Sequence, residues 1–167
     1  MRLKWVRPVC LSLFLTSSLS LAACNRTDPA AEAAAAANIK AGEAFLAEKA
    51  KEPGIQKLPK GLLYKVISPA SDPNAPKPTL RDTVKIHYEG RLVDGTVFDS
   101  SYERGVPAAM PLDGLVEAWK IAVPQMKTGE TWELYVPAQL GYGETGAGPI
   151  PPNSVLVFKI QLLGIQP

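Results

Sequence analysis

Two stretches of the sequence, residues 84–101 and 141–163, bring aromatic and apolar side chains together beside strand signals. The first reads VKIHYEGRLVDGTVFDSS and the second reads GYGETGAGPIPPNSVLVFKIQLL. Aromatic and aliphatic side chains that converge form a dry cleft, in which a bound ligand loses its contact with water. Phe98 and Asp99 follow each other where a strand ends. These residue types favour binding and desolvation as the chemistry, and neither requires a nucleophile.

The first stretch predicts a β-hairpin. One strand covers Thr83 to Gly90 and a second ends at Phe98, and residues 93–96 (Val-Asp-Gly-Thr) join them. Asp-Gly is the strongest short hairpin signal. The second stretch ends in a strand from Val155 to Leu163 with period-two alternation. That alternation puts four apolar side chains on one face of the strand: Leu156, Phe158, Ile160 and Leu162.

The remaining elements complete the predicted sheet. A strand begins at Gly61, and Thr131 to Val136 reads as another strand. Residues 68–79 form a loop that contains four prolines, and residues 102–111 are rich in turn formers. A short apolar helix is expected from Leu115 to Val123. Four or five antiparallel strands with one short helix predict an α+β fold, in which a curved antiparallel sheet packs over the helix.

Several motifs follow one another in a fixed order between Gly61 and Ile165. They are HYEG (87–90), DGTVFDSS (94–101), Leu115-Val116 followed by Trp119, the turn 127–130, the LGYG loop (140–143) and PIPPNSVLVFKIQLL (149–163). In this order they resemble the FKBP-type peptidyl-prolyl cis-trans isomerases, whose sheet is a half-barrel wrapped over one helix. Residues 42–48 and 58–62 are similar to bacterial members of the macrophage infectivity potentiator type, which carry a further N-terminal helix.

The resemblance implies roles for particular side chains. Trp119 would form the floor of a proline pocket, and Asp99 would lie beside the twisting amide. The candidates for catalysis are Asp99, Tyr142 and Phe98, and those for substrate binding are Tyr88, Val116, Trp119, Ile150 and Phe158. Tyr142 and the backbone N–H of Ile150 would donate hydrogen bonds to substrate carbonyls. Taken singly, each aromatic residue fits a core role better than a site role, whereas the ordered set favours the pocket. Asp99 also fits a turn cap, or it could pair with Arg104, which matches an arginine of the family.

The implied activity is the cis-trans isomerisation of X-Pro bonds in exported or envelope proteins, which makes proline-containing polypeptides the expected partners. A non-catalytic module that binds proline segments, or a chaperone, is the alternative. Ala108 stands in a segment, residues 106–110, where many members have an aromatic residue, and Pro149 stands where a residue with a free N–H is usual. A macrolide is a further ligand that the resemblance implies, and these departures would weaken its binding more than the activity.

Other chemistries find little support. Residues 141–146 match G-x-G-x-x-G, but Pro149, Pro151 and Pro152 exclude the helix that a dinucleotide site requires. His87 is the only histidine and lies in the middle of a strand, so a structural role is expected for it rather than a place in a catalytic triad. The sequence shows no cluster of metal ligands and no basic face for nucleic acid, and it calls for no cofactor.

The N-terminus predicts export and a lipid anchor. Basic residues precede an apolar run from Val9 to Leu21, which is shorter than a membrane-spanning helix. Leu21-Ala22-Ala23-Cys24 then resembles a bacterial lipobox, in which Cys24 becomes the lipidated first residue; ordinary secretion is the alternative. By the same resemblance, Asn25 after the cysteine would favour sorting to the outer membrane of a Gram-negative host, facing the periplasm. The expected organisation is a signal peptide (1–23), a lipidated cysteine and flexible tether (24–37), a short helix and linker (38–60) and the isomerase domain (61–167).

The helix in this linker region is expected to begin with Asn38 as its cap and to extend through Glu52. Phe45 and Leu46 are among its apolar residues, and Pro53-Gly54 would end it. A helix of about 15 residues is marginal on its own in water. It therefore needs a partner, which is either the domain itself or a second copy of the chain in a homodimer, and the sequence leaves both alternatives open.

Overall fold

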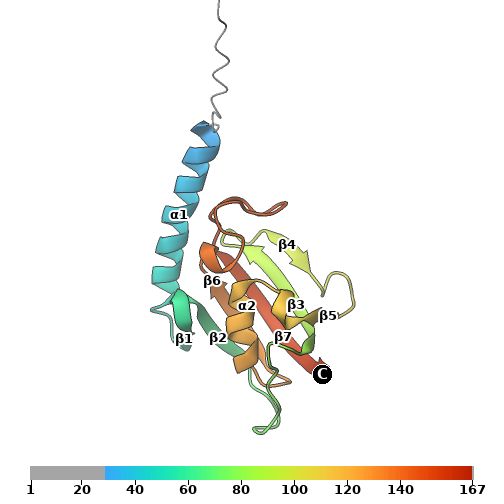
Figure 1. Cartoon of the computed structure of the whole chain (residues 1–167). Helices are drawn as coiled ribbons and strands as arrows, with labels where there is room; N and C mark the ends of the chain where they lie inside the picture. The colour runs from blue at the N-terminus through green and yellow to red at the C-terminus, as the bar shows by residue number, and fades with distance from the viewer. Residues whose placement is uncertain (1–28, 167) are drawn as a thin grey trace, which may run out of the picture.

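A computed structural model describes residues 29–166 of the chain. It consists of a long N-terminal helix, a seven-stranded sheet and a short second helix that lies across the sheet (Figure 1). The elements are α1 (Pro29–Lys49), β1 (Ile55–Lys57), β2 (Leu63–Ser68), β3 (Thr83–Leu92), β4 (Val97–Ser100), β5 (Ala108–Pro111), α2 (Glu117–Ala122), β6 (Thr131–Val136) and β7 (Leu156–Gln166).

The sheet is antiparallel throughout. Its strand order is β1-β2-β6-β7-β3-β4, and β5 also pairs with β3. The longest strands, β3 and β7, lie side by side in the middle, with Tyr88 opposite Ile160 and Gly90 opposite Phe158. The predicted α+β fold, a curved antiparallel sheet over one short helix, is confirmed.

The main core fills the space between one face of the sheet and α2. The four side chains predicted to share a face of β7 all lie in it, together with Trp119 of α2. Strand residues that alternate along β3 and β6, such as Ile86 and Leu134, complete this core from the neighbouring strands. The concave side of the sheet therefore holds the apolar side chains that surround α2.

The opposite face of the sheet is covered in part by α1. Leu63, Tyr135 and Val157 form a second buried cluster there, and Phe45 and Leu46 of α1 pack against it. This contact explains why Val157 is buried although it faces away from the main core. Of the two partners that the sequence leaves open for this helix, the structure contains the domain itself, and a dimer remains a prediction.

The helix α1 differs from the prediction at both ends. It begins at Pro29 rather than at Asn38 and ends at Lys49, so residues 29–37, assigned to a flexible tether, are helical. Alanine has the highest helix propensity, and this segment is rich in alanine. Asn38 consequently lies inside the helix and does not cap it.

Two short strands were missed by the sequence analysis. β1 has three residues, and β5 has four and lies in a segment predicted to be turn-rich. Strands this short have too few residues for a period-two pattern to stand out. The predicted hairpin is present: Gly95 adopts φ +91° in its turn, and the Leu92 N–H donates to Thr96 O at 2.9 Å.

The signal segment and Cys24 lie outside the described residues, so the structure does not test the predicted cleavage or lipidation. Within residues 29–166, no helix is long and apolar enough to span a membrane.

Candidate functional site

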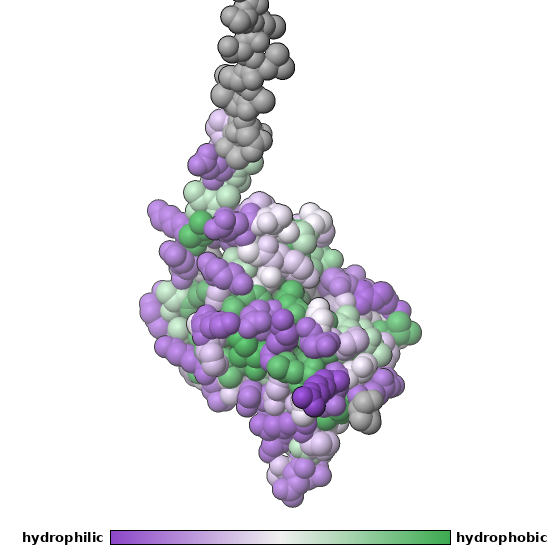
Figure 2. All heavy atoms as spheres, viewed as in Figure 1, coloured by the Kyte–Doolittle hydropathy of each residue, from purple (hydrophilic) through white to green (hydrophobic). Residues whose placement is uncertain are grey.

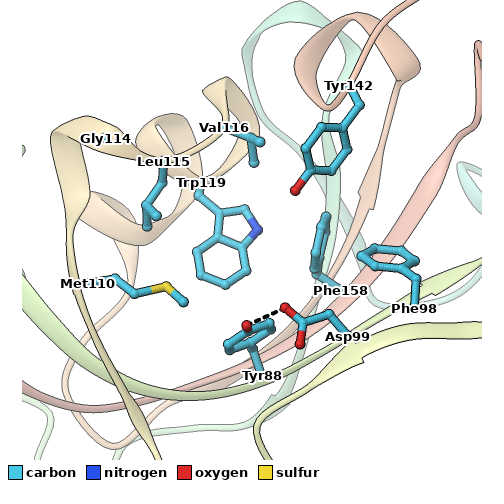
Figure 3. Close-up of a pocket in the computed structure, with 10 residues that line it drawn as sticks. All are labelled: Tyr88, Phe98, Asp99, Met110, Gly114, Leu115, Val116, Trp119, Tyr142 and Phe158. Atoms are coloured by element: carbon cyan, nitrogen blue, oxygen red, sulfur yellow. Dashed lines mark hydrogen bonds between the residues drawn. The ribbon is translucent and has the colours of Figure 1, made fainter. Parts of the chain in front are cut away.

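A cavity of about 280 Å³ opens between α2 and the concave face of the sheet. Figure 2 shows apolar surface gathered over α2 and the adjoining strands, with polar side chains around it. Ten residues line the cavity and are drawn in Figure 3: Tyr88, Phe98, Asp99, Met110, Gly114, Leu115, Val116, Trp119, Tyr142 and Phe158.

Trp119 forms the floor of this cavity. It projects from α2 and is only 3% exposed. Its ring meets Tyr88 edge-on at 5.4 Å between centroids and Phe158 edge-on at 5.3 Å, with interplanar angles of 80° and 87°. Phe98 meets Phe158 in the same manner at 5.7 Å. Edge-to-face packing is a favourable aromatic geometry, so these four rings fix one another in place.

The strand register brings these rings together. Tyr88 lies on β3, Phe98 on β4 and Phe158 on β7, and all three strands are neighbours through β3. Gly90 lies between the two phenylalanines, opposite Phe158 on one side and Asp99 on the other. A Cβ atom at Gly90 would stand 2.5 Å from the Phe98 ring and 2.9 Å from Phe158 Cε1. The absence of a side chain at this position therefore allows both rings to line the cavity.

A charged cluster stands at one edge of the cavity. The Tyr88 hydroxyl donates to Asp99, and Arg104 Nη1 donates to the other carboxylate oxygen. Arg104 Nη2 also donates to the Tyr88 hydroxyl at 2.9 Å. Burial raises the pKa of Asp99, but the hydrogen bonds from Tyr88 and Arg104 outweigh it, and the pKa lies below its ordinary value of 3.8. Asp99 is consequently ionised at neutral pH.

The same cluster keeps Tyr88 protonated. Burial raises the pKa of Tyr88, and its hydrogen bond to Asp99 raises it further. Its hydroxyl therefore remains a donor to the carboxylate at neutral pH. The predicted pairing of Arg104 with Asp99 is present. Hydrogen bonds from both Arg104 and Tyr88 therefore fix the orientation of the Asp99 carboxylate.

The opposite rim is built from loops and from the start of α2. Tyr142 is 39% exposed, and its hydroxyl points into the cavity (Figure 3). Val116 precedes the first turn of α2 and lies beside Trp119. Seven of the eight residues that the resemblance implied are thus among the lining residues.

Ile150 is the exception. It is 6% exposed and is not one of the lining residues. Its N–H donates to Ala147 O at 2.9 Å, and the Ala147 N–H donates back to Ile150 O at 3.0 Å. This N–H would have to leave Ala147 O before it could donate to a substrate carbonyl, so the substrate-binding role of Ile150 stays a prediction.

The sequence analysis did not select Met110, Gly114 or Leu115, which also line the cavity. Met110 lies on β5 within the segment that departs from the family pattern. Its side chain forms part of the cavity wall, and a methionine side chain is flexible and adaptable. The missing signal was β5 itself, because its pairing with β3 directs this segment toward the cavity.

His87 lies on the other side of the sheet from Tyr88, since adjacent strand residues face opposite ways. Its Nδ1 is 3.0 Å from Ser101 Oγ, and its ring stacks on Tyr102 at 4.8 Å. Both contacts lie on the face of the sheet that turns away from the cavity. Among residues 29–166 no group of His, Cys, Asp and Glu side chains is arranged to hold a metal ion.

Fold and cavity together define an α+β ligand-binding protein whose site desolvates its ligand and contains no activated nucleophile. Comparison with known proteins identifies the family. The profile of the FKBP-type peptidyl-prolyl cis-trans isomerases matches residues 75–163, and that of the domain amino terminal to FKBP-type peptidyl-prolyl isomerases matches residues 19–66. The chain belongs to the FKBP-type peptidyl-prolyl cis-trans isomerases.

Its similarity is to the Mip group of this family, as predicted. The chain is 47% identical over 130 residues to the peptidyl-prolyl cis-trans isomerase Mip of Coxiella burnetii, covering 77% of this chain and 55% of that protein. It is 43% identical to the outer membrane protein MIP of Legionella longbeachae, covering 77% and 54%. The crystal structure of FkpA from Escherichia coli superposes with a TM-score of 0.78 at 38% identity, covering 83% of this chain and 63% of FkpA. The chain thus spans about half the length of the curated relatives it matches.

Proposed function

We propose that this chain accelerates cis-trans isomerisation of X-Pro bonds, with the prolyl ring bound over Trp119 and the twisting amide beside Asp99. The observation that carries this proposal is the aromatic enclosure, in which Trp119, Tyr88 and Phe158 meet edge to face around one cavity with an ionised carboxylate at its edge. Membership of the isomerase family supports the same reaction.

The energetics of the reaction suit such a cavity. Rotation about the peptide bond has a barrier of roughly 18–20 kcal/mol because amide resonance is lost at the twisted geometry. A turnover of about 10–1,000 per second requires the barrier to fall by roughly 4–7 kcal/mol relative to spontaneous exchange. The planar amide has the larger charge separation, and water stabilises it. Moving the amide into an apolar cavity removes that stabilisation and so favours the twisted form.

The polar groups at the rim would orient the substrate. The Asp99 carboxylate is aimed by Tyr88 and Arg104, so it presents a fixed negative charge toward one side of the bound amide. Tyr142 would donate its hydroxyl to a substrate carbonyl from the other side (Figure 3). The Asp99 charge is already oriented when the amide twists, which makes its interaction with the twisted form effective, whereas the Tyr142 hydroxyl would hold a substrate carbonyl in the planar and twisted forms alike.

A proline-binding module without catalysis is the second candidate. Met110 supports it, because a flexible wall holds the prolyl ring less firmly than an aromatic wall does. Phe98→Ala and Asp99→Ala separate the two functions. Isomerisation of an Ala-Leu-Pro-Phe reporter peptide would be measured beside its binding affinity. An enzyme loses turnover in both variants, and the loss in kcat exceeds any loss in affinity.

Val97→Ala provides the matched control for Phe98→Ala. Val97 is the preceding residue on β4, is 39% exposed and is not one of the lining residues. We expect this variant to keep the wild-type rate. A folded wild-type protein that binds the peptide without accelerating its isomerisation would eliminate the enzyme in favour of the binding module.

We also propose that the chain is exported and anchored by lipid on Cys24, acting on proline-containing segments of exported or envelope proteins. The LAAC motif and the preceding apolar run support the anchor, and the name of the Legionella longbeachae relative supports the outer membrane as its place. Incorporation of labelled palmitate into the wild-type chain and its absence in Cys24→Ala would test the anchor, and separation of inner from outer membranes would test its location in the outer membrane.

A homodimer and a macrolide ligand are further proposals for the same protein. The N-terminal half of α1 extends beyond the sheet (Figure 1) and offers a surface for a second copy. Light scattering on the purified chain would give its mass in solution. The cavity has a size suited to a small apolar ligand, and calorimetric titration with a macrolide would give its affinity.

A further inference from the structure

The helix α1 contacts the loop that carries Tyr142 as well as the back of the sheet. Gly42 is the buried residue of this helix, and a Cβ atom at Gly42 would lie 2.6 Å from Val155 Cγ2. One turn earlier, Asn38 Nδ2 donates to Pro152 O at 2.9 Å. Residues four apart share a helix face, so both contacts come from the same side of α1, where the loop between β6 and β7 rises beside the helix (Figure 1).

Internal hydrogen bonds connect these contact points to Tyr142. The Asn153 N–H donates to Gly143 O at 2.9 Å, and the Gly143 N–H donates to Ala138 O at 2.8 Å. The Gly146 N–H donates to Tyr142 O at 3.1 Å. The residue that follows Tyr142 is therefore bonded directly to the residue that follows Pro152. These bonds link the backbone beside Pro152 to the backbone beside Tyr142.

We propose that α1 is a positioning element of the substrate site, in which Asn38 and Gly42 hold the back of the loop and thereby fix the Tyr142 hydroxyl in the cavity. This inference rests on the proposed function, since it assigns Tyr142 to substrate binding. Asn38 and Gly42 are positioning residues, because neither lines the cavity in which the substrate would bind.

A single substitution at the contact between α1 and the loop would change how the two pack together. A second cavity of about 270 Å³ lies beside it, bordered by Asn38, Gly42, Asp94 and Val155 among others. This cavity leaves space beside the contact, into which Val155 and the loop can move when a side chain is added at Gly42. The far end of α1 is held independently, because Phe45 and Leu46 pack on the sheet and Lys49 Nζ lies 5.3 Å from the Tyr135 ring centre. A change at Asn38 or Gly42 therefore disturbs the loop without releasing the helix.

The test uses the detergent-solubilised full-length chain and compares Gly42→Ala with wild type. The added methyl group must displace Val155, although alanine itself favours the helix more than glycine does. We expect KM for the Ala-Leu-Pro-Phe reporter to rise by about three- to tenfold with kcat nearly unchanged, as loss of binding in ground and transition states predicts. Adding Val155→Ala removes the clashing Cγ2 atom and should restore KM to within about twofold of the Val155→Ala single variant.

Asn38→Ala should raise KM by a smaller factor, about two- to threefold, because it removes one exposed hydrogen bond. Lys40→Ala is the matched control, since Lys40 is an exposed residue of the same helix. The decisive comparison repeats Gly42→Ala in a Tyr142→Phe background. If α1 acts through the Tyr142 hydroxyl, the effect of Gly42→Ala on KM falls to less than about 1.5-fold there. An equal effect with and without that hydroxyl would overturn the proposal.

A second measurement separates this inference from the proposed function. The chain has five tyrosines, so ring resonances of ¹³C-labelled tyrosine can be assigned to Tyr142 by the Tyr142→Phe variant. We expect Gly42→Ala to shift the Tyr142 resonances and Lys40→Ala to leave them in place. This result holds whether or not the wild-type protein accelerates isomerisation. Unmoved Tyr142 resonances in Gly42→Ala would refute the positioning role even if the chain proves to be an active isomerase.

Discussion

Gly90→Ala tests the aromatic enclosure at the point where the strands bring its rings together. The new Cβ atom would lie 2.5 Å from two atoms of the Phe98 ring and 2.9 Å from Phe158. Carbon atoms in contact stand about 3.5–4.0 Å apart, so the Phe98 ring has to move by about 1 Å. Phe158 is buried against Trp119 and has little room, whereas Phe98 is only partly buried. The displacement therefore falls mainly on Phe98, which swings away from the cavity.

Two effects follow from this displacement. Overpacking of this kind lowers the free energy of unfolding by about 1–3 kcal/mol. A wall displaced by about 1 Å lowers kcat/KM by about 10- to 100-fold, because the prolyl ring is no longer held over Trp119. Urea denaturation gives the first quantity, and isomerisation of the reporter peptide gives the second.

Gly164→Ala is the matched control for Gly90→Ala. Gly164 lies on β7, and a Cβ atom there would have no other atom within 4 Å. We expect this variant to keep wild-type activity and to change the free energy of unfolding by less than about 1 kcal/mol. If the kcat/KM of Gly90→Ala stays within about twofold of the values for the wild type and for Gly164→Ala, the reasoning that ties the ring positions to activity is refuted.

Three further outcomes are expected. Leu134→Ala empties a fully buried position of the main core and should lower the free energy of unfolding by about 2–5 kcal/mol in urea denaturation; a loss below about 1 kcal/mol would contradict tight packing there. Because the pKa of Asp99 is lowered in the folded state, its stabilising contribution is complete above the ordinary value of 3.8 and is lost as the pH falls through the lower folded pKa. Melting temperatures of Asp99→Asn should therefore decline less than those of the wild type below about pH 4, and parallel profiles would show that the carboxylate is not held by its partners. Tyr88→Phe removes one donor to Asp99, so the carboxyl pKa measured by NMR should rise toward its ordinary value, and an unchanged pKa would assign the shift to Arg104 alone.

Sequence periodicity was sufficient for the elements that stabilise themselves locally. The hairpin at residues 93–96 follows from Asp-Gly, whose glycine tolerates the positive φ that the turn requires. The four alternating side chains of β7 were placed on the correct face, because a strand directs every second residue to one side. The sequence pattern predicts that α1 starts at Asn38, because asparagine is a common helix cap. The alanine-rich residues before Asn38 are helical as well, because alanine favours the helix without a cap.

Other features depend on contacts between segments that are distant in the sequence. β5 is recognisable only through its pairing with β3, and that pairing brings Met110 to the cavity wall. The resemblance implies that the Ile150 N–H donates a hydrogen bond to the substrate. In the folded loop this N–H donates to the carbonyl oxygen of Ala147. The contact of Gly42 with Val155 joins residues that no local pattern connects.

The sequence by itself determined the α+β class, the hairpin, the inward face of β7 and the identities of seven side chains that line the cavity. Each of these depends on residue type and on spacing within one segment, or on an ordered set of motifs. Only the tertiary structure decided that Gly90 makes room for Phe98 and Phe158, that Tyr88 and Arg104 both aim Asp99, and that α1 holds the loop of Tyr142. Such relations are set by strand register and helix docking, because these bring together atoms whose separation along the chain carries no periodic signal.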